Sequence, residues 1–184
     1  EYITQLLGQY DLVRALSCRG EDEVLLLCHK TLRRYLVVRS YAEPVVAYEK
    51  LKAIRHPNLP EVFESRRFPD GQVVLEEYVH GTLLADVLNR TVLSYRNAKR
   101  GLIGVGAALS VLHDMAIVHR DIKPENVTIS DDGRVVLLDL NASRFHTSEK
   151  RSDTVVLGTI GYAPPEQFGI SQSGVTADVY ALGV

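Results

Sequence analysis

The 184-residue chain contains no tryptophan, one methionine and only two cysteines. Cys18 and Cys28 do not have the spacing of a metal site, so we expect both to be ordinary core or surface residues without a redox role. This cysteine usage is typical of a reducing compartment and predicts a cytoplasmic protein.

Long apolar runs and an excess of charge are also absent. The longest apolar runs, such as "VVLLDL", are far shorter than the roughly 20 residues that span a bilayer, and the N-terminus has no signal-peptide pattern. With 21 basic and 23 acidic residues there is no basic patch for nucleic acid or for a membrane surface. The apolar content of 46% is enough for the core of one domain or of two small lobes.

The first part of the chain has the pattern of a small antiparallel sheet. Between Tyr10 and Arg39, β-rich runs alternate with polar turns, which predicts a meander. Pro44 resembles the first residue of a short helix, and Asp70-Gly71 is a hairpin signal between two further strand-like runs. We expect residues 10–79 to form this lobe.

The remaining residues, 80–184, favour helices. A run of apolar residues recurs every three or four positions and predicts one buried helical face, at Ala98, Leu102, Val105, Leu109 and Leu112. The stretch "TADVYALGV" reads as the start of another helix that reaches Val184 without a cap, so we expect the domain to continue and this lobe to be incomplete. No linker separates the lobes, which should pack directly and leave a cleft between them.

A second hairpin signal, "NVTIS" and "RVVLLD" around "DDG", places two oxygen-bearing side chains together. If Asn126 and Asp139 are opposite each other, their Cα atoms should be about 4.5–5.5 Å apart. An amide oxygen and a carboxylate at that separation suit Mg²⁺, and Asp121 on the preceding loop could act beside the ion as a base. The alternative is that Asn126 and Asp139 only cap the ends of the hairpin.

The segment "HRDIKPEN" is followed by an Asp after the next hairpin strand. Other distinctive segments are "RHPNLP", "EEYVHGTLL", "GTIGYAPPEQFG" and "DVYALG". In these segments the chain resembles the eukaryotic-type Ser/Thr protein kinase family, and its sequence is most similar to bacterial members. "HRDIKPEN" and the later Asp match the family's catalytic loop and metal ligand. The resemblance implies an α+β bilobal fold with a β-rich N-lobe carrying one short helix and a mainly helical C-lobe that stops at its central helix.

The resemblance also implies ATP and Mg²⁺ as cofactors and a protein substrate or signalling partner. Asp121 would orient the substrate hydroxyl, Lys123 would neutralise the transferred phosphoryl group, and Asn126 and Asp139 would hold the metal. Lys123 together with Thr159 is the pattern of Ser/Thr kinases rather than tyrosine kinases. Arg39 takes the place of the lysine that grips the nucleotide phosphates, so the nucleotide would be bound by Arg39, Lys123, Asn126 and Asp139.

Control and support of the catalytic loop follow from the same resemblance. Arg120 beside the catalytic Asp121 implies a loop that phosphorylation can order, and candidate acceptors are Ser148, Ser152 and Thr154. Asp178 would steady the catalytic loop from the central helix.

The family's glycine-rich loop is largely lost. Ser17, Arg19 and Asp22 stand at the three glycine positions, and only Gly20 remains inside the turn. Side chains there keep the backbone N–H groups away from phosphates, and Asp22 would add negative charge near a triphosphate.

The partner of the phosphate-gripping residue is also missing. The family's helix glutamate falls on Ala47, and Glu43 lies one turn too early to replace it. We therefore expect Arg39 inside the cleft with no partner at position 47. The metal-binding Asp139 is followed by Leu140 and Asn141, so the usual glycine of this motif is absent.

Three alternatives remain open from the sequence. The intact catalytic loop favours a slow ATP- and Mg²⁺-dependent Ser/Thr kinase, whereas the altered glycine-rich loop, Arg39 and Ala47 favour an inactive pseudokinase that acts as a nucleotide-binding or protein-interaction module. The third is an inert fragment of either.

Overall fold

The structure is a computed structural model that describes residues 2–145, 159, 161–168 and 174–184. It has the predicted α+β composition and divides into two compact units. One unit comprises Glu1–Ile54 and Pro60–Tyr78, and the other comprises Arg55–Leu59 and Val79–Val184. In the part of the chain that is described, no helix is both long and apolar enough to cross a bilayer.

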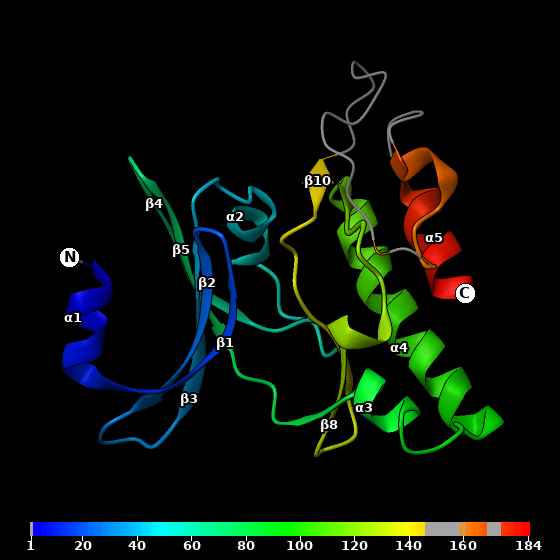
Figure 1. The fold of residues 1–184 in the computed structure, drawn as a ribbon, viewed down its shortest axis with the longest axis horizontal. Coiled ribbons are helices and arrows are strands. Elements are labelled where there is room, and N and C mark those ends of the chain that lie inside the picture. The colour runs from blue at the N-terminus through cyan, green and yellow to red at the C-terminus, as the bar shows by residue number, and fades with distance from the viewer. Residues whose placement is uncertain (1, 146–158, 160, 169–173) are drawn as a thin grey trace. The chain divides into compact units, whose positions relative to one another are not determined.

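The first unit is built on a five-stranded antiparallel sheet (Figure 1). The strands, in spatial order, are β1 (Tyr10–Arg19), β2 (Asp22–His29), β3 (Tyr35–Tyr41), β5 (Gly71–Glu77) and β4 (Val62–Phe68). The predicted meander is confirmed in β1–β2–β3, and the predicted hairpin is confirmed in β4–β5, where Phe68 pairs with Gly71. This sheet places Arg39 on β3, between strands on both sides.

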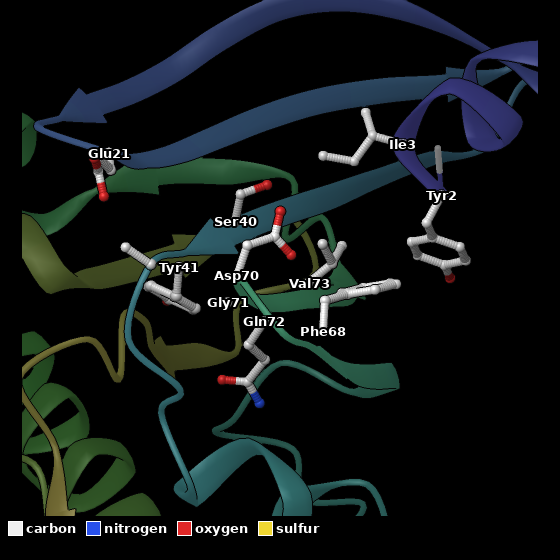
Figure 2. Close-up of a pocket in the computed structure, with 11 residues that line it drawn as sticks. Tyr2, Ile3, Glu21, Ser40, Tyr41, Phe68, Asp70, Gly71, Gln72 and Val73 are labelled. Atoms are coloured by element: carbon white, nitrogen blue, oxygen red, sulfur yellow. The ribbon is translucent and has the colours of Figure 1, made fainter.

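One face of this sheet is covered by a helix that the sequence analysis did not predict, α1 (Tyr2–Gln9) (Figure 1). Its apolar side chains pack on the core of β2, β3 and β5. The Tyr2 hydroxyl donates to Glu64 Oε2 at 2.5 Å, and this bond together with burial raises the pKa of Tyr2 to about 12, burial being the larger cause. A hollow of about 430 Å³ lies beside α1. Ile3, Ser40 and Phe68 are among the lining residues that Figure 2 shows.

The other face of the sheet carries α2 (Ala47–Leu51), which is only five residues long. The predicted helix start at Pro44 is wrong, since α2 begins at Ala47; before it, the Val45 N–H donates to Gln72 Oε1 at 2.7 Å. The same Gln72 donates to Ser65 Oγ at 2.8 Å, and Ser65 donates to Glu49 Oε1 at 2.7 Å. A chain of hydrogen bonds from β5 through β4 therefore fastens α2 to the sheet.

The second unit contains three α-helices in its described part. These are α3 (Leu84–Leu88), α4 (Tyr95–Asp114) and α5 (Val175–Gly183). The long α4 begins at Ser94, whose hydroxyl accepts the N–H of Asn97, as an N-cap does. Its buried face is Gly104, Val105, Ala108, Leu109 and Leu112.

The predicted buried face of α4 is correct in its second half and wrong at Leu102, which is 51% exposed. The helix comes close to strand β9 (Val135–Leu137) at Gly104, where an added methyl group would overlap the side chain of Val135. The close approach requires a glycine at this position, and the contact face starts there rather than at the larger Leu102.

The second unit also contains short β-strands, which connect and pair its loops. They are β6 (Gly81–Leu83), β7 (Ile117–Val118), β8 (Val127–Ser130), β9 and β10 (Arg144–Phe145). The sheet order is β6-β8-β9, with β7 paired to β10. Gly81 is needed where β6 meets β8, because a Cβ there would overlap the backbone carbonyl of Ile129. Two 3-10 helices, η1 (Pro124–Asn126) and η2 (Pro165–Phe168), complete the described elements.

The β8–β9 hairpin is present, but its register differs from the prediction by one residue. Val127 pairs with Leu137 and Ile129 with Val135, so the pairing is centred on Asp132. The loop has three residues, and Gly133 adopts the left-handed conformation with φ +84° that such loops require. Opposition of Asn126 and Asp139 requires a two-residue loop, and the three-residue loop moves every partner by one position.

Candidate active site

The loop from His119 to Asn126 is held in place by a buried carboxylate. Asp178, on α5, is fully buried and accepts the backbone N–H groups of His119 at 2.9 Å and of Arg120 at 2.7 Å. His113 Nε2 lies 2.8 Å from the same carboxylate. Arg120 adopts the left-handed conformation with φ +72°, and the Gln167 side chain donates to its carbonyl at 2.8 Å. An arginine in this conformation needs such support from its surroundings.

Asp121 lies at the centre of the polar contacts in this loop. Lys123 Nζ is 2.7 Å from Asp121 Oδ2, and the Thr159 hydroxyl donates to Oδ1 at 2.7 Å. The Asn126 amide donates to Oδ2 at 2.9 Å and to the Asp121 carbonyl at 2.8 Å. Lys123 also donates to Thr159 Oγ1 at 2.9 Å, so one hydroxyl group lies between a carboxylate and an ammonium group.

These contacts fix the charge of Asp121. Burial alone would raise the pKa of its carboxyl group, but the hydrogen bonds from Lys123 and Thr159, the positive charge of Lys123 and the hydrogen bond from Asn126 together hold the pKa below its usual value. The carboxylate is therefore ionised at neutral pH. It can accept a hydrogen bond from a hydroxyl group, and it is a weak base.

The predicted direct opposition of Asn126 and Asp139 is wrong by one residue. The partner of Asn126 is Leu138, whose N–H donates to the Asn126 carbonyl at 2.8 Å. Asp139 lies just beyond the hairpin in the left-handed conformation with φ +61°, so the alternation of a strand does not set the direction of its side chain. Its Oδ1 accepts the N–H of Asn141 at 3.3 Å.

The donor set at this end of the hairpin fits Mg²⁺. The Asn126 amide nitrogen donates hydrogen bonds to Asp121, and these bonds orient the amide group. Its oxygen is therefore the atom that can act as a ligand of a cation. With a carboxylate at Asp139 this gives two hard oxygen donors, and Mg²⁺ commonly uses only one or two protein ligands together with water and substrate phosphate. Within the described residues, no group of three or more His, Cys, Asp or Glu side chains could hold a metal.

Arg39, in the first unit, has a partner that the sequence analysis missed. Its Nε donates to Glu76 Oε1 on β5 at 2.6 Å, and both residues are almost completely buried, at 8% and 3% exposure. Ala47 is buried at the start of α2. The available signal was an acidic residue inside the apolar run "VVLEE", but its meaning depends on which strand lies beside β3.

The positions of the lost glycines form part of the β1–β2 hairpin. Ser17 pairs with Val24 and Arg19 with Asp22, which leaves a tight turn at Gly20 and Glu21. Asp22 Oδ1 accepts the N–H of Ala42 at 3.1 Å. The carboxylate that was expected near a phosphate is thus used to fasten the end of β3.

Two support residues could not be assigned from a local pattern in the sequence. Gln167 donates to the carbonyl of Arg120, which lies 47 residues away along the chain. His113 contacts Asp178, which lies 65 residues away. The predicted phosphorylation candidates lie outside the described residues, at Ser148, Ser152 and Thr154.

Comparison with known proteins gives a match over nearly the whole chain. The family model described as protein kinase domain matches residues 4–184. Among similar proteins, the serine/threonine-protein kinase PknA of Mycobacterium tuberculosis is 30% identical over 197 residues, covering 97% of this chain and 46% of that protein. The serine/threonine-protein kinase kin-29 of Caenorhabditis elegans is 26% identical over 190 residues, covering 97% of this chain and 23% of that protein.

A third relative is the probable serine/threonine-protein kinase pknA2 of Bifidobacterium longum, which is 31% identical over 134 residues, covering 72% of this chain and 18% of that protein. The chain spans less than half the length of each of these curated relatives. The match to the family model and the catalytic-loop contacts agree, and the chain belongs to the protein kinase domain family.

Proposed function

We propose that the protein transfers phosphate from ATP to serine or threonine hydroxyl groups of proteins, slowly and with Mg²⁺. The observation that carries the proposal is the arrangement around Asp121, where Lys123 and the Thr159 hydroxyl contact the same carboxylate. An ionised carboxylate beside an ammonium group is the combination that can orient an acceptor hydroxyl and stabilise negative charge on a phosphoryl group.

Asp121 would act mainly by orientation. Its lowered pKa makes it a poor base, but phosphoryl transfer has a loose transition state in which little proton removal is needed early. The carboxylate would accept a hydrogen bond from the substrate hydroxyl and direct a lone pair toward phosphorus. The contact between Thr159 and Asp121 supports this role, because a hydroxyl group already donates to the same carboxylate.

Lys123, Asn126 and Asp139 would supply the electrostatic part of the reaction. The Lys123 ammonium group would neutralise charge on the transferred group, and the oxygens of Asn126 and Asp139 would hold Mg²⁺. The metal, when bound, neutralises phosphate charge. Asp178 would keep the loop in shape through the His119 and Arg120 N–H groups.

The rate is expected to be low because the nucleotide-binding residues of the first unit are altered. Loss of one preorganised stabiliser typically costs roughly 10²–10³ in rate. Here the three glycine positions carry side chains. One of them is Asp22, whose carboxylate accepts the N–H of Ala42 after the end of β3.

The proposal can be tested by phosphate incorporation in the full-length protein with Mg·ATP, followed by identification of the modified residues. Asp121→Asn should lower the rate about 100-fold or more. Asp131→Asn is the matched control, because Asp131 is an exposed residue of the β8–β9 loop. We expect phosphoserine and phosphothreonine, and equal rates for wild type and Asp121→Asn would contradict the proposal.

The second candidate function is a catalytically inactive pseudokinase that acts as a nucleotide-binding or protein-interaction module. It is favoured by one specific observation, the absence of glycine at the three loop positions, with Asp22 committed to Ala42. If the wild-type protein shows no Mg²⁺-dependent nucleotide binding by titration, the enzyme proposal fails and this candidate replaces it.

A further inference from the structure

Arg39 and Glu76 form a buried ion pair between two neighbouring strands of one sheet. Glu76 lies opposite Val37, and Arg39 lies opposite Val74, so the two charged residues are diagonal neighbours on the same face. Their side chains are 9% and 5% exposed, and Arg39 Nε donates to Glu76 Oε1 at 2.6 Å. A buried guanidinium group needs an anion close by, and Glu76 supplies it.

We infer that Glu76 is the positioning residue for Arg39, so that strand β5 rather than helix α2 sets the direction of the cationic group. The inference rests on the proposed function and on the role that the resemblance implies for Arg39, contact with the phosphates of ATP. Ala47, at the position of the family's helix glutamate, has a methyl side chain that cannot accept a hydrogen bond. Glu76 is the acid that the structure gives to this arginine.

The location of Glu76 makes the arrangement rigid. Strand β5 is hydrogen-bonded to β3 on one side and to β4 on the other, so the Glu76 backbone is held relative to Arg39 by the sheet itself. A carboxylate on a helix moves when the helix shifts, whereas this carboxylate moves only if the sheet is disrupted. The carboxylate that contacts Arg39 is therefore held by the sheet and not by α2.

The ion pair is also compatible with a role toward phosphate. The guanidinium group carries its N–H donors in a planar fork that suits phosphate, and its Nε edge donates to Glu76. Holding that edge on Glu76 restricts the rotation of a long side chain. Pre-ordering the group in this way lowers the entropy cost of binding a phosphate.

The test compares ATP with adenosine as ligands of the full-length protein at fixed Mg²⁺. Adenosine has no phosphates, so its affinity should not depend on Arg39. We expect Glu76→Gln and Arg39→Gln each to weaken ATP binding roughly 10- to 100-fold and to leave adenosine binding within about twofold of wild type. A merely structural role of Glu76 would weaken both ligands together.

Glu77→Gln is the matched control, because Glu77 is the next residue of β5 and points to the other face of the strand. It should keep the wild-type preference for ATP. Glu76→Asp covers the case in which Glu76→Gln does not fold, since it keeps the charge and withdraws the carboxylate by one methylene; we expect a several-fold loss of ATP preference.

The outcomes separate the inference from the function on which it rests. If Arg39→Gln weakens ATP binding while the Glu76 variants that fold bind ATP as wild type does, the positioning inference is overturned and the proposed function stands. If wild type does not bind ATP at all, both are overturned. An ATP-specific loss in the Glu76 variants supports both.

Discussion

Replacing Asp178 by alanine should destabilise the protein more than any single loss of an exposed carboxylate. Asp178 is fully buried, and its two oxygens accept the N–H groups of His119 and Arg120. Alanine leaves two buried donors without an acceptor, at about 1–3 kcal/mol each. The expected cost is therefore about 2–6 kcal/mol, against a total stability of about 5–15 kcal/mol for a domain.

The loss should be visible in thermal unfolding and in hydrogen exchange. For a domain of this size about 1 kcal/mol lowers Tm by roughly 2–4 °C, so a loss of about 4 kcal/mol lowers it by roughly 8–16 °C. The exchange protection of the His119 and Arg120 amides should fall most, because they lose their acceptor directly. Arg120 should also leave its left-handed conformation, since a contact that supports its backbone is gone.

Asp114→Ala is the control for this experiment. Asp114 is an exposed carboxylate at the end of α4, and its loss should change stability by less than about 0.5 kcal/mol. The reasoning is refuted if Asp178→Ala and Asp114→Ala unfold at the same temperature, or if amide exchange at residues 119 and 120 does not change.

Three further predictions concern other parts of the chain. Glu76→Gln should lower the free energy of unfolding by about 3–5 kcal/mol, while the double change Arg39→Met with Glu76→Met should be near neutral, as urea unfolding of both can show; equal losses would contradict a buried pair. Gly81→Ala should destabilise the protein, because the added methyl group overlaps a backbone carbonyl. Gly101→Ala, on the open face of α4, should stabilise it by about 0.5–1 kcal/mol. The reverse order of the two variants in thermal unfolding would be inconsistent with the fold. The pKa of Asp121 is held below its ordinary value of about 4, so the carboxylate stays ionised above that pH and its contribution to the rate is lost only as the pH falls below it. A pH–rate profile should therefore show no acid limb from this group between pH 5 and 8. An acid limb in that range that is absent in Asp121→Glu would contradict the assignment.

Contacts between residues that are close along the chain are the easiest to anticipate from a sequence. Asp121, Lys123 and Asn126 lie within six residues of one another, and their contacts are made through a single loop and one 3-10 turn. The β4–β5 hairpin was predictable for the same reason, because the Asp70-Gly71 turn stands between two β-rich runs. In both cases the residue pattern and the structure involve the same few positions.

The features that were missed depend on contacts between distant residues. The Arg39–Glu76 pair joins positions 37 apart, and only the strand order β3-β5-β4 makes them neighbours. The stretch before α2 is likewise tied to a distant residue, since the Val45 N–H donates to Gln72, 27 residues away. The register of the β8–β9 hairpin depended on whether its loop had two or three residues, which an Asp-Gly pair does not decide.

The hairpin error has a direct effect on the candidate metal site. A one-residue change of register normally reverses the face on which each side chain lies. Here the left-handed conformation of Asp139 ends the strand before that residue, so its side-chain direction is set by its own backbone angles. The proposal that Asn126 and Asp139 hold Mg²⁺ therefore rests on their donor atoms and not on strand pairing.

The buried Arg39–Glu76 pair implies that positions 47 and 76 should change together during the divergence of related chains. One buried guanidinium group needs one acid, and a second acid beside it would add an unpaired negative charge. Chains with an acid at the position of Ala47 should thus carry an apolar residue at the position of Glu76, and chains that lost the helix acid should have gained one on the strand. Intermediates with both acids or with neither should be rare, so the exchange should be found as a paired substitution wherever it occurred.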